Sequence, residues 1–211
     1  MKLRSIFVRT SRFLKSQRFG VSPNCIYTDG FYRDAVDKHE APSAAAVIDT
    51  ICEVFRPASI FDIGCGNGIY LHAAARRGIV AAGCDGSETG VRLCPSDVFV
   101  FQHDLRKPLK LNRRFDLCLC FEVAEHIPAK HSALLVESCS WASDTALFSS
   151  ARKGQGGHDH INEQPQHFWD ALFARKGLAL DELSTKIVRD LFRERSVVSW
   201  LGKNACVYRR G

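Results

Sequence analysis

The sequence contains no apolar run that approaches the ~20 residues that a helix needs to cross a bilayer. It also lacks a basic start followed by an apolar stretch and a small-residue cleavage site, so we expect no secretory signal. Internal repeats and low-complexity tracts are absent as well. What remains is 211 residues with 45% hydrophobic and 25% charged side chains, which predicts one globular domain with a sizeable core.

No CxxC pair occurs among the nine cysteines, and their number is odd. Both features disfavour a zinc site and a closed disulfide framework. Cys84, Cys118 and Cys120 fall inside apolar runs that we expect to be buried strands, where cysteine behaves as a small hydrophobe. The pattern predicts a reducing compartment, and we therefore expect a cytoplasmic protein.

Acidic residues are missing from the start of the chain, because the first one is Asp29. The basic residues before it, interleaved with apolar residues near helical spacing, are Lys2, Arg4, Arg9, Arg12, Lys15 and Arg18. Three interpretations stay open: a basic amphipathic helix in peripheral contact with anionic lipid or an acidic partner, a mitochondrial transit peptide, and a solvated helix that caps the domain. We divide the chain into a basic N-terminal helix and lid segment, residues 1–43, and a main domain, residues 44–211.

Short apolar runs alternate with helical patterns through the main domain. Helices are predicted near residues 44–55, 70–77, 130–141 and 165–175. Strands are predicted over residues 59–63, 79–84, 98–101, 115–120, 146–149, 178–182 and 205–209. This alternation predicts an α/β fold, in which a parallel sheet is covered by helices on both faces.

A glycine-rich segment, Asp62-Ile-Gly-Cys-Gly-Asn-Gly68, separates the first predicted strand from the next helix. Glycines allow a sharp turn and let a ligand approach the backbone with no Cβ in the way. Dinucleotide-binding loops prefer G-x-G-x-x-G with a pyrophosphate at the helix N-terminus, but here the third glycine comes one residue early. Asp62 would repel a pyrophosphate and would attract the ammonium and sulfonium of S-adenosylmethionine. The spacing therefore favours a cationic ligand.

Two further carboxylates follow the ends of predicted strands. Asp85 comes after the second strand, where an acidic side chain can accept hydrogen bonds from both ribose hydroxyls. Asp104 comes just past the third strand, where it can accept from an adenine amino group. Each alone is also explained as a turn or cap residue. Together with Asp62 they indicate one cofactor site, because open α/β sheets bind ligands at the carboxyl ends of their strands.

The segments Ser59–Gly68, Gly83–Ser87, His103–Leu105 and Arg114–Ile127 resemble class I S-adenosylmethionine-dependent methyltransferases. The similarity is strongest to a broad methyltransferase-domain group with an E-V-x-E-H segment after strand four, and it covers about residues 58–150. It implies a Rossmann-like seven-stranded sheet in the order 3-2-1-4-5-7-6, with the last strand antiparallel. It also implies S-adenosylmethionine as cofactor. The predicted cofactor-binding residues are Asp62, Gly64, Cys65, Gly66, Gly68, Asp85, Gly86, Asp104, Leu105, Cys120 and Phe121.

The acceptor side offers three candidates for catalysis, namely Glu122 and His126 after strand four and His160 in a glycine-rich loop after strand five. Methyl transfer needs mainly alignment, and it needs a general base only when the acceptor must lose a proton. The alternative is that His126 caps a helix and that His160 is an exposed loop residue; Asn162 could orient the acceptor. A metal site of His158, His160 and a carboxylate rests on one short cluster, so we predict none.

Aromatic residues precede the main domain at Tyr27, Phe31 and Tyr32. An aromatic lid over the cofactor and ordinary packing are both compatible with them.

The segment after strand four is Cys120-Phe-Glu-Val123, not the Asn/Asp-Pro-Pro-aromatic motif that suits transfer to nucleobase amino groups. Basic residues are not interleaved with aromatics on one evident surface, so nucleic acid is not favoured. We expect a methyltransferase (EC 2.1.1.-) that acts on a small-molecule, glycan or lipid-linked acceptor, with O-methylation preferred. The alternatives are a non-catalytic binding module of the same fold at a membrane or acidic partner, and a nicotinamide-dependent oxidoreductase, which the glycine spacing disfavours.

Overall fold

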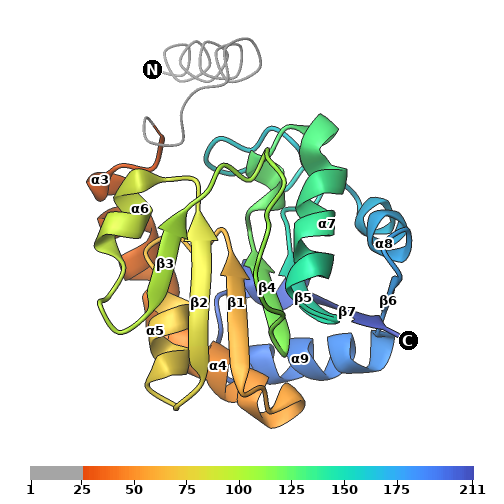
Figure 1. Cartoon of the computed structure of the whole chain (residues 1–211), viewed down its shortest axis with the longest axis horizontal. Helices are drawn as coiled ribbons and strands as arrows, with labels where there is room; N and C mark the ends of the chain where they lie inside the picture. The colour runs from red at the N-terminus through yellow and green to blue at the C-terminus, as the bar shows by residue number, and fades with distance from the viewer. Residues whose placement is uncertain (1–25) are drawn as a thin grey trace.

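A seven-stranded sheet in the order β3-β2-β1-β4-β5-β7-β6 forms the centre of the protein (Figure 1). The computed structural model describes residues 26–211, so the predicted basic helix and its membrane contact lie outside the described residues. β1 to β5 pair in parallel, and β7 runs antiparallel to β5 and β6. The predicted Rossmann-like order and the antiparallel last strand are confirmed. The strands are β1 Ser59–Ile63, β2 Val80–Asp85, β3 Phe99–Gln102, β4 Leu117–Phe121, β5 Thr145–Ser149, β6 Leu178–Leu180 and β7 Cys206–Arg210.

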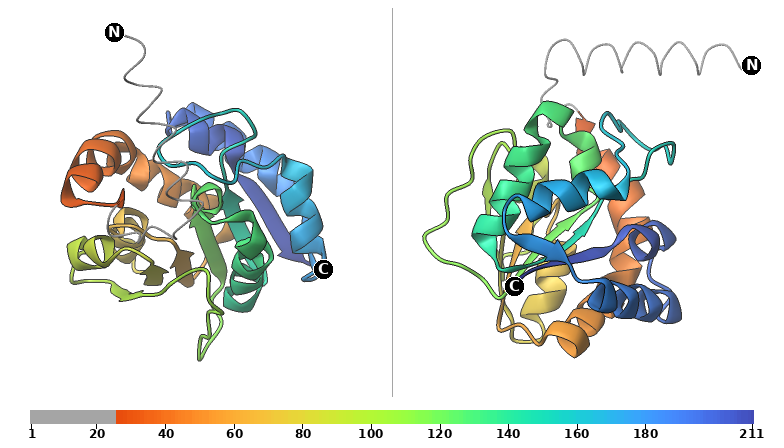
Figure 2. Two further views of the ribbon diagram at one scale, coloured as in Figure 1. Left: turned by 90° about the horizontal axis from the view of Figure 1, so that it is seen from above. Right: turned by 90° about the vertical axis from the view of Figure 1, so that its right-hand side faces the viewer.

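Helices cover both faces of the sheet, as predicted (Figure 2). One face packs against α7 (Ser132–Ala142) and α8 (Gln166–Ala174), and the other packs against α4 (Ala41–Phe55), α5 (Ile69–Ala75) and α9 (Glu182–Glu194). The remaining helical elements are α3 Asp29–Phe31, η1 Tyr32–Glu40, α6 Glu88–Leu93, η2 Ala124–His126, η3 Ala129–His131 and α10 Ser199–Asn204. Because both faces are covered, the central strands β1 and β4 are buried along their whole length.

The segment before β1 is helical over more of its length than its sequence indicated. α4 begins at Ala41, and the π-helix η1 leads directly into it from Tyr32. The boundary that we placed between residues 43 and 44 therefore falls inside α4. π-Helical turns are rare, and they occur frequently at functional sites.

The predicted strand over residues 178–182 ends at Leu180, and a helix that the apolar pattern did not predict follows it. The side chain of Asp181 accepts a hydrogen bond from the Ser184 N–H and caps α9. The available signal is Asp181 followed directly by Glu182, because aspartate is preferred at the N-cap and acidic residues are favoured in the first turn of a helix.

None of the cysteines within residues 26–211 forms a disulfide. Cys84, Cys118 and Cys120 are buried in the core, as the apolar runs predicted. Within the same residues, none of the helices combines the length and the apolarity that a membrane crossing requires.

The turn after β1 depends on Gly64, which has a φ of +80°. A Cβ built on this residue would lie 2.4 Å from Val123 Cγ2, so the loop after β4 packs directly on the glycine backbone. The N–H groups of Gly64 and Cys65 both donate to the carbonyl of Cys84, at 2.8 and 3.1 Å, and hold the turn against β2. The loops after β1, β2 and β4 are thereby brought to one place.

Replacing Gly64 with alanine should lower the free energy of unfolding by about 3 kcal/mol, because it adds backbone strain to a clash with a packed side chain. Gly78→Ala is the matched control, since Gly78 has a φ of +77° but no atom within 4 Å of the position that a Cβ would occupy. The control should cost only about 1 kcal/mol, because it adds the strain of a left-handed backbone without a clash. Chemical denaturation measures both values, and equal losses would show that packing against Val123 is unimportant.

Candidate functional site

A cavity of about 760 Å³ lies at the carboxyl ends of the parallel strands. Its walls come from the loops after β1, β2, β3 and β4, from η1 and α10, and from the segment that follows β5. The volume is in the range of sites for small molecules and cofactors. The predicted site residues that line it are Asp62, Gly64, Cys65, Gly66, Asp85, Gly86, Asp104, Leu105, Phe121, Glu122, His126 and His160.

Two predicted cofactor residues are not among those that line the cavity. Gly68 starts α5 with a φ of +76°, and a Cβ there would lie 3.1 Å from Cys94 Sγ, so this glycine serves the packing of α5 on α6. Cys120 is fully buried in the core between the sheet and α7. Phe121, its neighbour, reaches the cavity from the end of β4 instead.

Asp85 holds the cofactor loop in place. Its carboxylate accepts hydrogen bonds from the N–H of Gly66 at 2.8 Å and from the N–H of Ser87 at 2.7 Å. Burial raises the pKa of Asp85, and these two hydrogen bonds oppose the shift. Each carboxylate oxygen has a second lone pair, so the group can still accept from ribose hydroxyls while it fixes the loop.

Asp62 and Glu40 place two further carboxyl groups in this end of the cavity. Burial, followed by the charge of Asp85, raises the pKa of Asp62 to about 7. Burial, followed by the charge of Glu122, raises the pKa of Glu40 to about 7. Buried carboxyl groups that crowd one another are stabilised by a cation, so this end of the cavity fits the charge of S-adenosylmethionine.

Glu40 is a cavity residue that no sequence motif indicated. It ends the π-helix η1, and its Oε2 lies 3.5 Å from the hydroxyl of Tyr70. The sequence placed this residue in the lid segment. The structure places it where η1 continues into α4, and the sequence pattern did not predict that continuous helix.

At the β3 side of the cavity, Asp104 is paired with Arg106. The Arg106 guanidinium donates from Nε at 2.8 Å and from Nη2 at 3.0 Å, and the Arg106 N–H adds a third hydrogen bond at 3.0 Å. Hydrogen bonding from Arg106 lowers the pKa of Asp104, which keeps it ionised. Asp104 therefore lies at the cavity as predicted, but it shares its acceptor capacity between Arg106 and any adenine.

The acceptor side begins at Glu122, whose backbone is left-handed with a φ of +51°. Its N–H donates to both the carbonyl and the hydroxyl of Ser149, each at 3.1 Å, so β5 holds the residue in this conformation. Its carboxylate accepts from the side chain of Asn204 at 3.3 Å. A strained non-glycine residue that is held so firmly is typical of functional sites.

Glu125, His126 and His160 meet next to Glu122. Each offers one ligand atom, and these atoms lie within 4.8 Å of one another, which is close enough to hold a metal ion. Burial, followed by the charge of His160, lowers the pKa of His126 to about 3, so His126 is neutral. Glu125 is fully buried, and its Oε2 has no hydrogen-bond partner among the described residues. The arrangement can serve proton transfer or divalent-metal binding.

The loop after β5 is tied down by two glutamates. Glu125 Oε1 accepts from the N–H of Ala151 at 3.0 Å, at the start of the loop. Glu163 accepts from the N–H groups of Gly154 and Gly156 at 2.8 and 2.6 Å, and its Oε1 lies 3.0 Å from His160 Nδ1. The loop thus presents His160 in a fixed orientation rather than as a freely exposed side chain.

Asn162 does not line the cavity, so it is not placed to orient an acceptor. It is 3% exposed, and its amide donates to the carbonyl of Ala124 and to the hydroxyl of Ser132 at 3.1 and 2.9 Å. Its role is to anchor the loop on the segment after β4.

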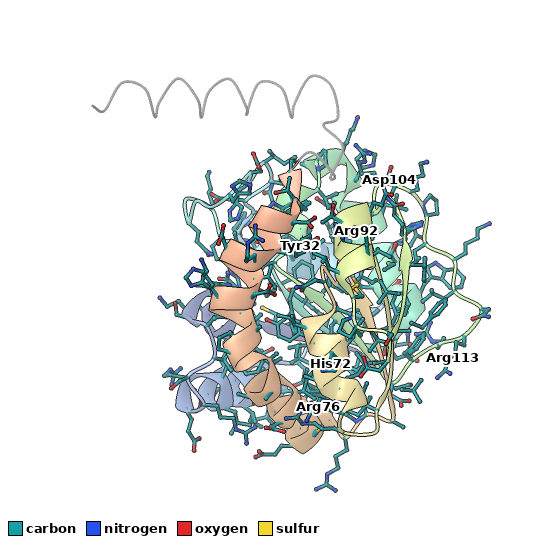
Figure 3. The ribbon with its side chains drawn as sticks, turned by 90° about the vertical axis from the view of Figure 1, so that its left-hand side faces the viewer. Tyr32, His72, Arg76, Arg92, Asp104 and Arg113 are labelled. Carbon is teal, nitrogen blue, oxygen red and sulfur yellow. The ribbon has the colours of Figure 1, made fainter. Side chains whose placement is uncertain are left out.

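The aromatic residues that precede the domain cover the cavity. Tyr27 meets His126 edge-on with 5.9 Å between ring centroids, and Phe31 stacks on His158 at 5.5 Å. Figure 3 shows Tyr32 between η1 and α6, at the same end of the molecule as Asp104. A Cβ on Gly90 would lie 2.4 Å from the Tyr32 hydroxyl, so α6 needs a glycine at this contact. Tyr27, Phe31 and Tyr32 all line the cavity, and their role as a lid over the cofactor stays a prediction.

The fold, the glycine turn and the acidic cavity define a class I S-adenosylmethionine-dependent methyltransferase. The family described as "Methyltransferase domain" matches residues 36–183, and the chain belongs to it. S-adenosylmethionine is the methyl donor of this class, and the cradle of Gly64, Gly66 and the three strand-end carboxylates fits it.

Curated relatives resemble this chain over a limited part of their length. A ubiquinone biosynthesis O-methyltransferase of Methylobacterium nodulans is 29% identical over 120 residues, which cover 49% of this chain and 48% of the relative. A protein with the same name from Coxiella burnetii is 30% identical over 76 residues, or 33% of this chain and 32% of the relative. The alignments thus cover about half or less of these relatives.

Solved structures share the fold at low sequence identity. The CcbJ methyltransferase of Streptomyces caelestis has a TM-score of 0.67 and 12% identity, over 88% of this chain and 98% of that one. The magnesium protoporphyrin IX methyltransferase of Synechocystis PCC 6803, crystallised with bound SAH, has a TM-score of 0.61 and 15% identity, over 96% of this chain and all of that one, 100%.

The affinity for S-adenosylmethionine should rise as the pH increases through about 7. Asp62 and Glu40 have pKa values raised to about 7 from 3.8 and 4.5, so both carry protons below that pH and ionise above it. A bound cation favours the ionised form, so binding near neutral pH releases protons. Calorimetry in two buffers of different ionisation enthalpy measures the release.

Asp62→Asn is the matched variant for this test, because it removes one titrating group and keeps the shape. It should bind S-adenosylmethionine about tenfold more weakly at high pH and depend less on pH, because one of the charges that favour the cation is lost. The ligand-free wild type should show the opposite trend in stability, since groups with raised pKa values destabilise the fold as they ionise. An affinity that does not change with pH would contradict the assignment.

Proposed function

We propose that this protein transfers a methyl group from S-adenosylmethionine to a hydroxyl of a small-molecule, sugar or lipid-linked acceptor. The hydrogen-bonded pair of His160 and Glu163 beside the acceptor end of the cavity carries the proposal. A hydroxyl must lose its proton on methylation, and a histidine oriented by a carboxylate is suited to take it. The free cysteines among the described residues support action in the reducing cytoplasm.

The orientation of His160 determines which nitrogen is available. Glu163 accepts from Nδ1, which leaves Nε2 as the basic nitrogen. A Cβ on Gly157 would lie 2.3 Å from His160 Nε2, so the backbone of Gly157 packs closely on this edge of the ring and the position needs a glycine. The acceptor hydroxyl would give its proton to Nε2 while its oxygen is aligned with the donor.

The rest of the cavity aligns the reactants and keeps water out. The donor supplies an electrophilic methyl group on a sulfonium. Phe121 and Glu122 line the cavity at the end of β4, and Tyr27, Phe31 and Tyr32 line it from the segment before α4, where they would form a lid. Alignment in a closed, dry site supplies most of the rate enhancement that a direct displacement needs.

His160→Ala should lower kcat by about 10²- to 10⁴-fold, because it removes the general base, and should leave the affinity for S-adenosylmethionine unchanged. His167→Ala is the matched control, since His167 is exposed on α8 and does not line the cavity. Methyl transfer to small molecules of a cell extract, with products identified by mass, measures the activity. Full activity of His160→Ala would refute its role as a base.

A chelator distinguishes the two chemistries that Glu125, His126 and His160 can support. If His160 acts as a base without a metal ion, treatment with EDTA followed by desalting should leave the rate unchanged. A loss of activity that a divalent cation restores would instead show that the three residues hold a metal ion.

A further inference from the structure

α10 forms one wall of the cavity, and buried residues and hydrogen bonds hold it next to Glu122 at the acceptor end. Leu201 and Asn204 are 1% and 3% exposed, and they fix the helix to the core. The Asn204 side chain donates to Glu122 at 3.3 Å and to Gln155 at 3.1 Å, which ties α10 to the end of β4 and to the loop after β5. The side chains that α10 presents to the cavity are Ser199, Trp200 and Lys203.

Two of the described residues that line the cavity, Arg106 and Lys203, have permanently charged basic side chains. Arg106 is neutralised by Asp104 on the β3 side. Lys203 is exposed, and its side chain makes no hydrogen bond or ion pair with any residue in the range 26–211. An unpaired ammonium at the rim of an otherwise acidic cavity makes the acceptor end the place where an anionic group is stabilised.

Aromatic side chains line the cavity from α10, from the segment before α4 and from the loop after β5. Trp200 is partly buried on the α10 side, three residues before Lys203 and therefore on the same helix face. On the lid side, the rings of Phe31 and His158 stack with an interplanar angle of 30°. Surfaces of this kind favour a planar ring, because stacking and apolar burial both increase with flat contact area.

We propose that Trp200 and Lys203 select an aromatic hydroxy-carboxylate as the acceptor. The ring packs on Trp200, the carboxylate pairs with the Lys203 ammonium at the rim, and the reacting hydroxyl faces His160. One ammonium balances one negative charge, whereas the second charge of a dianionic phosphate would stay unbalanced in a cavity that Glu122 and Asp159 also line. This inference rests on the proposed function, since it names the acceptor of that site.

The test is a comparison of matched ligands on the full chain saturated with S-adenosylhomocysteine. Calorimetry is carried out with caffeate and its methyl ester, and with 4-hydroxybenzoate and its methyl ester. The carboxylates should bind about fivefold more tightly than the esters, and the preference should shrink as salt is added, because the ion pair is partly exposed. Equal affinity for acid and ester, or no saturable binding of either acid, would overturn the inference.

Variants separate the contribution of charge from that of shape. Lys203→Met should abolish the preference for the carboxylates and leave ester binding unchanged, and Lys203→Arg should retain the preference. Trp200→Leu should weaken acid and ester alike. Lys110→Met is the matched control, because Lys110 is exposed, carries the same charge and does not line the cavity. If Lys203→Met still binds the carboxylates more tightly than the esters, another group binds the anion and the inference is overturned.

Failure of this inference can be told apart from failure of the proposed function. Binding of S-adenosylhomocysteine and the dependence of methyl transfer on His160 test the reaction, and neither involves Lys203. If both hold while the carboxylate preference is absent, the protein is still a methyltransferase whose acceptor is neutral or cationic. If methyl transfer itself is absent, the proposed function fails first.

Discussion

The contact between Gly64 and Val123 positions the rest of the site. The left-handed turn after β1 leaves no room for a side chain, and the loop after β4 occupies that space. Since hydrogen bonds to Cys84 hold the same turn against β2, one small region fixes the relative positions of three strand-end loops. The carboxylates of Asp62 and Asp85 are close enough as a result for the charge of Asp85 to raise the pKa of Asp62.

This proximity has an electrostatic cost that determines the character of the cavity. Burial raises the pKa values of Asp62, Asp85 and Glu40. The charge of Asp85 adds to the shift at Asp62, and the charge of Glu122 adds to the shift at Glu40. A cationic ligand stabilises the ionised carboxylates, so the site favours ligands with a positive charge whatever their shape. The basic groups of the cavity lie elsewhere: Arg106 is paired on the β3 side, and Lys203 lies at the rim on α10.

The acceptor end is organised by a loop without regular structure. Glu125 and Glu163 hold the segment after β5 at its start and along its length, and Asn162 anchors it on the segment after β4. These polar groups replace the backbone pairing that a helix or strand would supply. His160 acquires a defined direction from this network, which a short glycine-rich loop would not otherwise provide.

The sequence pattern predicted the alternating strands and the donor end of the site, and the resemblance to class I methyltransferases implied the sheet order. Strand-end carboxylates such as Asp62, Asp85 and Asp104 can be predicted because parallel strands bring their carboxyl ends to one edge. Glycines with a positive φ, such as Gly64, are equally local, because the turn itself requires them. The alternation of apolar runs is also a local signal, and it predicted the bounds of all seven strands within two residues.

Tertiary structure decided the rest, because the remaining contacts join residues that are far apart in the chain. Gly68 and Cys120 fit the sequence pattern but serve packing, since α6 and α7 cover them. Glu40 and Lys203 reach the cavity from η1 and α10, near opposite ends of the described chain, and neither lies in a recognisable motif. Local spacing sets which residues end a strand, whereas the packing of distant helices sets which side chains face the ligand.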